Sequence, residues 1–177
     1  MSCNFEVEVL THRLIPVWML MEKIERGYTG LELVDISEAC DFTFENLRAV
    51  EKAEIHATDE SIEMGRVVVV RGDYLQKPCG FTVHKDKDRY RYSFWVQKND
   101  EDDVYDVAVD FVTDFFDPHN VDFAAMGYEM LMPRDFPAEM YTNSTIHTWV
   151  LAETYRDFEM KNFKRYEKKG FCVFSRV

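Results

Sequence analysis

Five aspartates carry the clearest chemical pattern in the sequence. Their spacing of 3, 4, 4 and 3 residues puts all of them on one face of an α-helix: Asp103, Asp106, Asp110, Asp114 and Asp117. At roughly 1.5 Å per residue the row would extend about 21 Å. Like charges four residues apart destabilise a helix by about 0.2–0.5 kcal/mol per pair, so the row is locally unfavourable without a partner. We therefore interpret these aspartates as the partner-binding residues.

Two other interpretations of this row stay open. The aspartates could form a solvated face that keeps the protein soluble. They could also pair within the chain with the basic segment 66–98, which has eight Lys and Arg against three acids. The segment 99–133 has ten acids and no Lys or Arg. Carboxylates at helical spacing could steer a basic protein into a complex, so a basic protein is the expected partner.

Other chemical patterns are incomplete. His56 and Thr58 fit half of a phosphoesterase HxT motif, but the sequence has no second HxT. Cys79 could be a nucleophile with His84 as its base, which needs proximity in space. Asp117, His119 and Asp122 could hold a divalent ion, although such triplets are frequent by chance. His147 is expected to be a core histidine. We therefore assign no catalytic residue and predict no metal or cofactor, and the balance leans against an enzyme.

Nucleic acid is also disfavoured as a ligand. The net charge is −12, from 33 acids and 21 bases, whereas nucleic-acid binding needs a basic surface. One strand does combine basic and aromatic residues, since Arg89, Arg91 and Trp95 share a face. The overall charge outweighs this strand.

The elements that must position these residues follow from hydrophobic periodicity. Strands are expected at residues 5–10, 31–36, 66–71, 80–84, 89–97, 145–151 and 171–177. Helices are expected after Thr11, after Asp41, near residues 58–64, and at residues 103–116 and 152–169. Residues 121–132 fit either state. In residues 89–97 the alternation predicts that Tyr90, Tyr92, Phe94 and Val96 face a core, with Arg89, Arg91 and Gln97 more exposed.

Together these elements predict an α+β fold. We expect a single domain over residues 1–177: a mostly antiparallel (mixed) β-sheet with about four helices packed on it. Its 177 residues and 46% hydrophobic content suffice for a core without disulfides or metals. The longest apolar run, residues 14–21, is too short to span a membrane. The N-terminus has no signal-peptide pattern, so four free thiols and a cytoplasmic location are expected.

These observations lead to three functional hypotheses. The first is a non-enzymatic acidic interaction protein of the inhibitor, immunity or anti-defence type, which docks on a basic partner through the Asp-rich helix. The second is a structural or assembly subunit of a viral particle or another oligomeric complex, built from copies of this chain. The third is a small enzyme or ligand-binding domain whose site is dispersed through the fold.

Overall fold

The structure is a computed structural model that describes residues 2–41, 43–99, 114–117, 120–128, 163–168 and 171–176. The chain forms two compact units. The central unit is His12–Gln97, and the terminal unit combines Met1–Thr11 with Lys98–Val177. The expected single domain over residues 1–177 stays a prediction.

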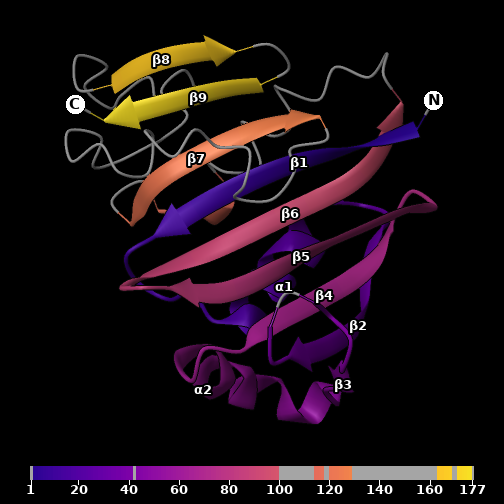
Figure 1. Cartoon of the computed structure of the whole chain (residues 1–177). Helices are drawn as coiled ribbons and strands as arrows, with labels where there is room; N and C mark the ends of the chain where they lie inside the picture. Colours follow the sequence, from indigo (N-terminus) through magenta and orange to yellow (C-terminus); the bar gives the residue numbers. More distant parts are fainter. Residues whose placement is uncertain are drawn as a thin grey trace. The chain divides into compact units, whose positions relative to one another are not determined.

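An antiparallel sheet forms the centre of the central unit (Figure 1). Its strand order is β3-β2-β4-β5-β6. The strands are β2 (Leu31–Ala39), β3 (Arg48–Ala49), β4 (Val67–Tyr74), β5 (Lys77–Asp86) and β6 (Arg89–Asn99). Strands β4, β5 and β6 are joined by tight turns, and their registers run without interruption.

One face of this sheet carries the main apolar core. Val70, Phe81 and Phe94 lie opposite one another on β4, β5 and β6, with Phe81 and Phe94 rings 5.2 Å apart. On β6, Tyr92 is 0% exposed and Phe94 is 8% exposed, as the alternation predicted. The expectation that Arg91 is more exposed is wrong, because its residue exposure is only 3%. Arg91 is buried with a carboxylate partner, Asp86, at 2.7 Å.

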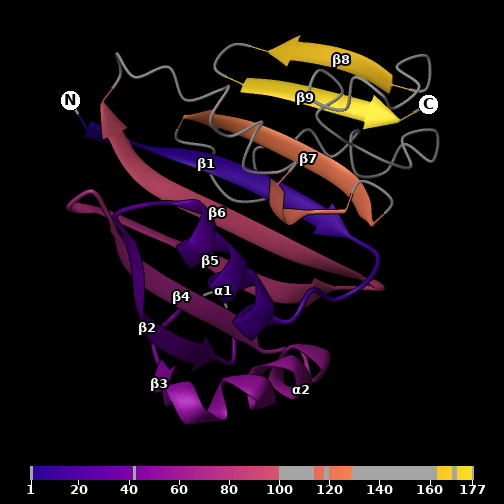
Figure 2. The same ribbon diagram turned by 180° about the vertical axis from the view of Figure 1, so that it is seen from behind.

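Helix α1 (Val17–Gly27) covers part of the central sheet (Figure 2). Its buried stripe has helical spacing and consists of Val17, Leu20, Met21 and Ile24. The chain enters α1 through a segment held by Tyr92, whose hydroxyl accepts from the Ile15 N–H at 2.6 Å and donates to the Ile15 carbonyl at 3.0 Å. The position before α1 is Pro16, whose side chain caps nothing. Thr11, after which this helix was expected, ends strand β1 (Ser2–Thr11).

The cap of α1 comes from a distant segment. Asp59, in the first turn of α2 (Thr58–Glu63), accepts a hydrogen bond from the Val17 backbone N–H. A carboxylate near a helix N-terminus satisfies one of the free N–H groups and suits the helix dipole. Burial nevertheless raises the pKa of Asp59, and its Oδ1 is buried without a hydrogen-bond partner among the described residues. The 3-10 helix η1 (Lys52–Ala57) precedes α2 and lies against α1.

The turn between β4 and β5 has an unusual backbone. Leu75 and Gln76 adopt φ values of 50° and 65°, which is the conformation of a type I′ hairpin turn. The Leu75 N–H donates to the Gly30 carbonyl at 3.0 Å, so the turn is tied to the segment before β2. A side chain at Gly30 would meet the Leu75 side chain.

A β-bulge distorts β2 next to Gly72. The pairing with β4 shifts between Leu33 and Asp35, which leaves Val34 72% exposed. At Gly72, opposite Leu33, an added Cβ would overlap the carbonyl oxygen of Glu32. Close contact between the two strand backbones therefore depends on glycine at this position.

The helix expected after Asp41 is wrong. The Asp41 carboxylate accepts from both the N–H and the hydroxyl of Thr43, at 2.9 and 2.6 Å, which forms a local turn. Phe44 follows with φ of 55°, a value outside the helical region, and packs against Ala39, Val67 and Val69. The chain then runs into β3 and η1.

The described part of the terminal unit is also antiparallel, in the order β1-β7-β9-β8. It comprises β1, β7 (Val121–Tyr128), β8 (Phe163–Lys168) and β9 (Phe171–Arg176). Residues 121–128, ambiguous from the sequence, form a strand. The helix expected over residues 152–169 is wrong where the structure describes it, because residues 163–168 pair with β9 from Phe163–Arg176 to Lys168–Phe171.

The predicted α+β fold with about four helices is therefore wrong. Apart from the helical residues Asp114 and Phe115, the described residues contain two α-helices, α1 and α2. The fold is rich in antiparallel strands. A turn and β3 replace the helix expected after Asp41, and the described part of residues 152–169 forms β8. The physical reason is that strand pairing and a local side-chain turn outweighed the weak helical periodicity of these segments.

Candidate functional site

The predicted Asp row lies only partly within the described residues. Asp103, Asp106 and Asp110 lie outside them. Asp114 is exposed and helical, and Asp117 is exposed. Between them Phe115 and Phe116 are 6% and 2% exposed. The end of the row therefore has carboxylates at the surface and aromatic rings in the interior.

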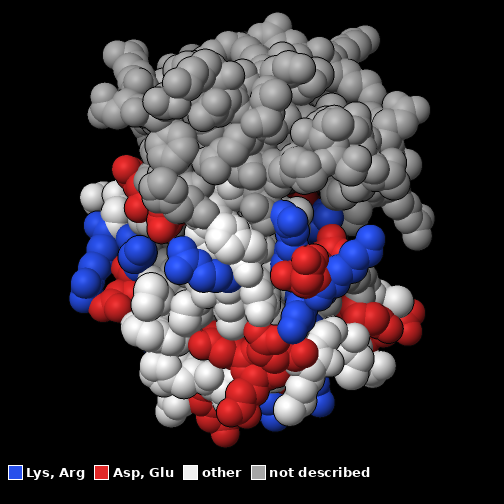
Figure 3. Space-filling model, turned by 90° about the vertical axis from the view of Figure 1, so that its left-hand side faces the viewer, with Lys and Arg blue, Asp and Glu red and all other residues white. Residues whose placement is uncertain are grey.

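The basic block at residues 66–98 is engaged in ion pairs with acids of the first 65 residues. Arg66 contacts Glu38, Arg71 contacts Asp35 at 3.9 Å, and Lys85 contacts Glu63 at 2.5 Å. Within the block itself, Arg91 contacts Asp86 and Arg89 lies 3.8 Å from Asp88. On the face shown in Figure 3, acidic side chains gather toward the end that carries α2, with basic side chains above them.

One polar cluster links α2 to strands β5 and β6. The Glu63 carboxylate accepts from the Lys85 ammonium on one oxygen and from the Tyr90 hydroxyl on the other. The Lys85 ammonium also lies 5.8 Å from the centre of the Tyr90 ring. The hydrogen bonds from Lys85 and then Tyr90 lower the pKa of Glu63, and the bonds to Glu63 raise the pKa values of Lys85 and Tyr90. Such solvent-facing contacts fasten α2 to the sheet and each contributes little free energy.

A second cluster centres on a buried carboxylate near the C-terminal end of β2, that of Glu38. The Glu38 side chain is 1% exposed, and its Oε2 contacts Arg48 Nη2 at 2.9 Å and Arg66 Nη1 at 3.4 Å. Glu38 Oε1 is buried without a hydrogen-bond partner among the described residues. Sequence reasoning missed this cluster. The available signal was an acidic residue two positions after Ile36, where strand alternation continues the inward-facing row.

The proposed nucleophile and base do not meet. Cys79 and His84 lie five residues apart on one uninterrupted strand, so their side chains project from opposite faces of the sheet. Burial, with a smaller contribution from Asp73, raises the pKa of Cys79 to about 11. Burial and then Arg91, opposed by Asp86, lower the pKa of His84 to about 4. A neutral, buried thiol without a neighbouring base has no nucleophilic role.

The HxT half-motif has a structural role in both residues. The Thr58 hydroxyl is buried and donates to the Ile55 carbonyl at 2.6 Å, where η1 passes into α2. The His56 ring packs against Trp18 of α1 with 5.1 Å between ring centres. These two residues join the helical segments to each other.

The aromatic and basic face of β6 is also engaged internally. Arg91 is buried against Asp86. The Trp95 ring lies over Gly80 of the neighbouring strand, close enough that a side chain at Gly80 would meet it. This arrangement withdraws one arginine and covers part of the tryptophan, which weakens the case for stacking nucleotide bases.

The remaining candidates lie largely beyond the described residues. His119 and His147 are outside them, and nothing is described of the Asp122 side chain. Within the described ranges, no three His, Cys, Asp or Glu side chains come together in a way that could hold a metal ion. Cys40 and Cys79 are free thiols. No helix in the described part of the chain is long and apolar enough to cross a bilayer.

Comparison with known proteins found no match, so a functional assignment depends on this geometry. No protein-family model, curated protein sequence or solved structure matches the chain.

Proposed function

We propose that the protein is a non-enzymatic acidic interaction protein, of the inhibitor, immunity or anti-defence type, that docks on a basic protein partner through residues 103–117. The observation that carries the proposal is at Asp114–Asp117, where exposed carboxylates flank the buried Phe115 and Phe116. This is the arrangement expected at the end of an amphipathic helix with an acidic outer face.

The charges of the central unit support the proposal. Its basic strands make ion pairs with Glu38, Asp35 and Glu63, all of which belong to the first 65 residues. The segment 99–133 contains ten acids and no Lys or Arg. A basic surface on a partner protein would complement this charge, and long-range attraction to it would raise the association rate.

The test compares two charge changes of equal size. One variant carries Asp106→Asn, Asp110→Asn and Asp114→Asn. The control carries Glu51→Gln, Glu54→Gln and Glu60→Gln, which removes three exposed charges from η1, the residue before it and α2 instead. Association with a lysine-rich peptide is measured by stopped-flow fluorescence at two salt concentrations.

We expect the Asp variant to associate about tenfold more slowly at low salt and to lose most of its salt dependence, because steering acts on the association rate. The control should keep most of the wild-type rate. Equal losses in both variants would show that net charge alone attracts the peptide, and the docking proposal would then be wrong.

A further inference from the structure

The Glu38 cluster combines one buried acid with two accessible bases. Glu38 lies on β2 with its side chain 1% exposed, whereas the Arg48 and Arg66 side chains are 62% and 43% exposed. Both guanidinium groups contact the same carboxylate oxygen. One carboxylate can neutralise one of these charges, so the cluster keeps a net charge of +1 at its accessible side.

Both arginines come from well-defined backbone positions. Arg48 is opposite Glu38 in the β2–β3 pairing, and the next strand residue, Ala49, is opposite Ser37. The Val50 N–H donates to the Ile36 carbonyl at 2.8 Å and extends this pairing. The Arg66 N–H donates to the Ser61 carbonyl of α2 at 3.0 Å. The two guanidinium groups are thus held together before any ligand arrives, which reduces the entropy lost on binding.

We propose that Arg48 and Arg66, oriented by Glu38, form a binding site for a phosphate group. A guanidinium has five N–H donors in a planar fork, and one donor from each arginine is used on Glu38. Arginine pairs suit phosphate because they offer charge and several parallel hydrogen bonds. The buried carboxylate serves as a positioning group beneath the arginines.

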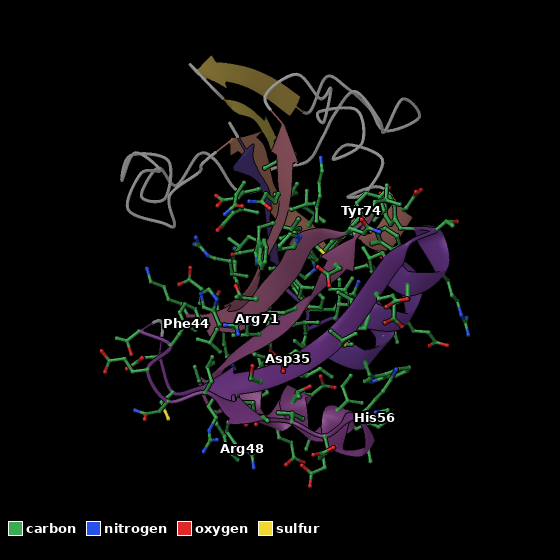
Figure 4. All side chains as sticks on the ribbon, turned by 90° about the vertical axis from the view of Figure 1, so that its right-hand side faces the viewer. Asp35, Phe44, Arg48, His56, Arg71 and Tyr74 are labelled. Atoms are coloured by element: carbon green, nitrogen blue, oxygen red, sulfur yellow. The ribbon has the colours of Figure 1, made fainter. Side chains whose placement is uncertain are left out.

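A purely structural ion pair is a poorer account of the cluster. A second arginine on one buried carboxylate adds a like charge next to the first, which the carboxylate does not neutralise. The Arg71–Asp35 pair shows the simpler arrangement in the same sheet: one base, one acid, 3.9 Å apart, with both side chains about half exposed. Figure 4 shows Arg71 beside Asp35. In the same view Tyr74 of β4 lies near one end of β2, and Arg48 lies near the other end. Arg71 is therefore a matched control.

The experiment titrates inorganic phosphate against chloride at constant ionic strength. Thermal unfolding and the NMR signals of the arginine side-chain N–H groups are followed for the wild type, Arg48→Gln, Arg66→Gln and Arg71→Gln. Glu38 keeps one arginine partner in each of the first two variants, so these are expected to fold. We expect the half-saturating phosphate concentration to rise about tenfold in each of them, because one charge-assisted contact is lost. Arg71→Gln should bind as the wild type does.

Glu38→Gln gives an independent readout. The amide oxygen can still accept from the arginines, but the competing negative charge is gone, so phosphate should bind more tightly than in the wild type. A second titration uses O-phosphoserine: tighter binding than inorganic phosphate assigns the site to a modified protein, and weaker binding assigns it to the free ion. Equal phosphate responses in the wild type, Arg48→Gln and Arg66→Gln would overturn the proposal. None of these variants alters residues 103–117, so the docking proposal is tested separately.

Discussion

Replacing Tyr92 by Phe isolates the contribution of one buried hydroxyl. The ring would stay in place in the core, while the hydroxyl that bonds both the N–H and the carbonyl of Ile15 would be lost. A buried hydrogen bond contributes about 0.5–1.5 kcal/mol, and the Ile15 backbone groups would lose their partner. We expect the free energy of unfolding to fall by about 2 kcal/mol. For a chain of this size the melting temperature would fall by about 4–8 °C.

Tyr90→Phe is the matched control for this prediction. Tyr90 lies two residues earlier on the same strand and the same face, but its hydroxyl donates to Glu63, which is exposed and keeps its bond to Lys85. Its loss should lower the free energy of unfolding by about 0.5 kcal/mol. Urea denaturation followed by tryptophan fluorescence measures both, since Trp18 and Trp95 lie in the central unit. If the two variants lose the same stability, the Tyr92 hydroxyl does not anchor the start of α1 and the reasoning fails.

Two further predictions concern the sheet. Gly72→Ala should lower the free energy of unfolding by about 3 kcal/mol or more, because its Cβ would overlap the Glu32 carbonyl. Gly65→Ala, where φ is 84° and no atom lies within 4 Å of the new Cβ, should lose only about 1–2 kcal/mol by urea denaturation. For His84, whose pKa falls from 6.5 to about 4 on folding, the unfolded chain binds more protons between these values, so stability declines as the pH falls through that window, by about 3 kcal/mol at most. His84→Gln should flatten this decline in denaturation curves recorded at several pH values, and an unchanged slope would contradict the assignment.

Local alternation identified the strands whose two faces differ most. In β6, aromatic and polar residues alternate, and Tyr92 and Phe94 are buried as predicted. The same pattern could not show that Arg91 is buried, because that depends on a carboxylate, Asp86, which the β5–β6 hairpin brings within ion-pair distance although it lies opposite Arg89. Alternation indicates which side of a strand a residue occupies, and pairing decides what it meets there.

Helix prediction failed where a short-range alternative was available. A helix was expected after Asp41, but an Asp two residues before Thr43 can equally form a turn, and it does. The segment Phe163–Lys168 was expected to be helical, and its pairing with β9 could be recognised only with knowledge of the partner strand. Strand pairing is non-local, which is why a local helical period did not reveal the strand at residues 163–168.

The candidate sites differ in how visible they are in the sequence. The Asp row has a helical period and was predicted from spacing alone, and its two described members, Asp114 and Asp117, are exposed. The Glu38 cluster joins residues separated by 10 and 28 positions along the chain, with no motif to connect them. Glu38 and Arg48 meet through the register of β2 with β3. The periodicity within a single element cannot show that two residues of different elements contact each other.

The remote cap on α1 also bears on how the chain is made. Asp59 is about 42 residues beyond Val17, the residue whose N–H it accepts, so at a synthesis rate of about 5–20 residues per second the helix leaves the ribosome about 2–8 s before its cap. An 11-residue helix is shorter than the length of about 12–15 residues at which isolated helices become stable. The nascent α1 therefore exposes its apolar stripe during that interval, and chaperones that bind short apolar segments would meet it before α2 does.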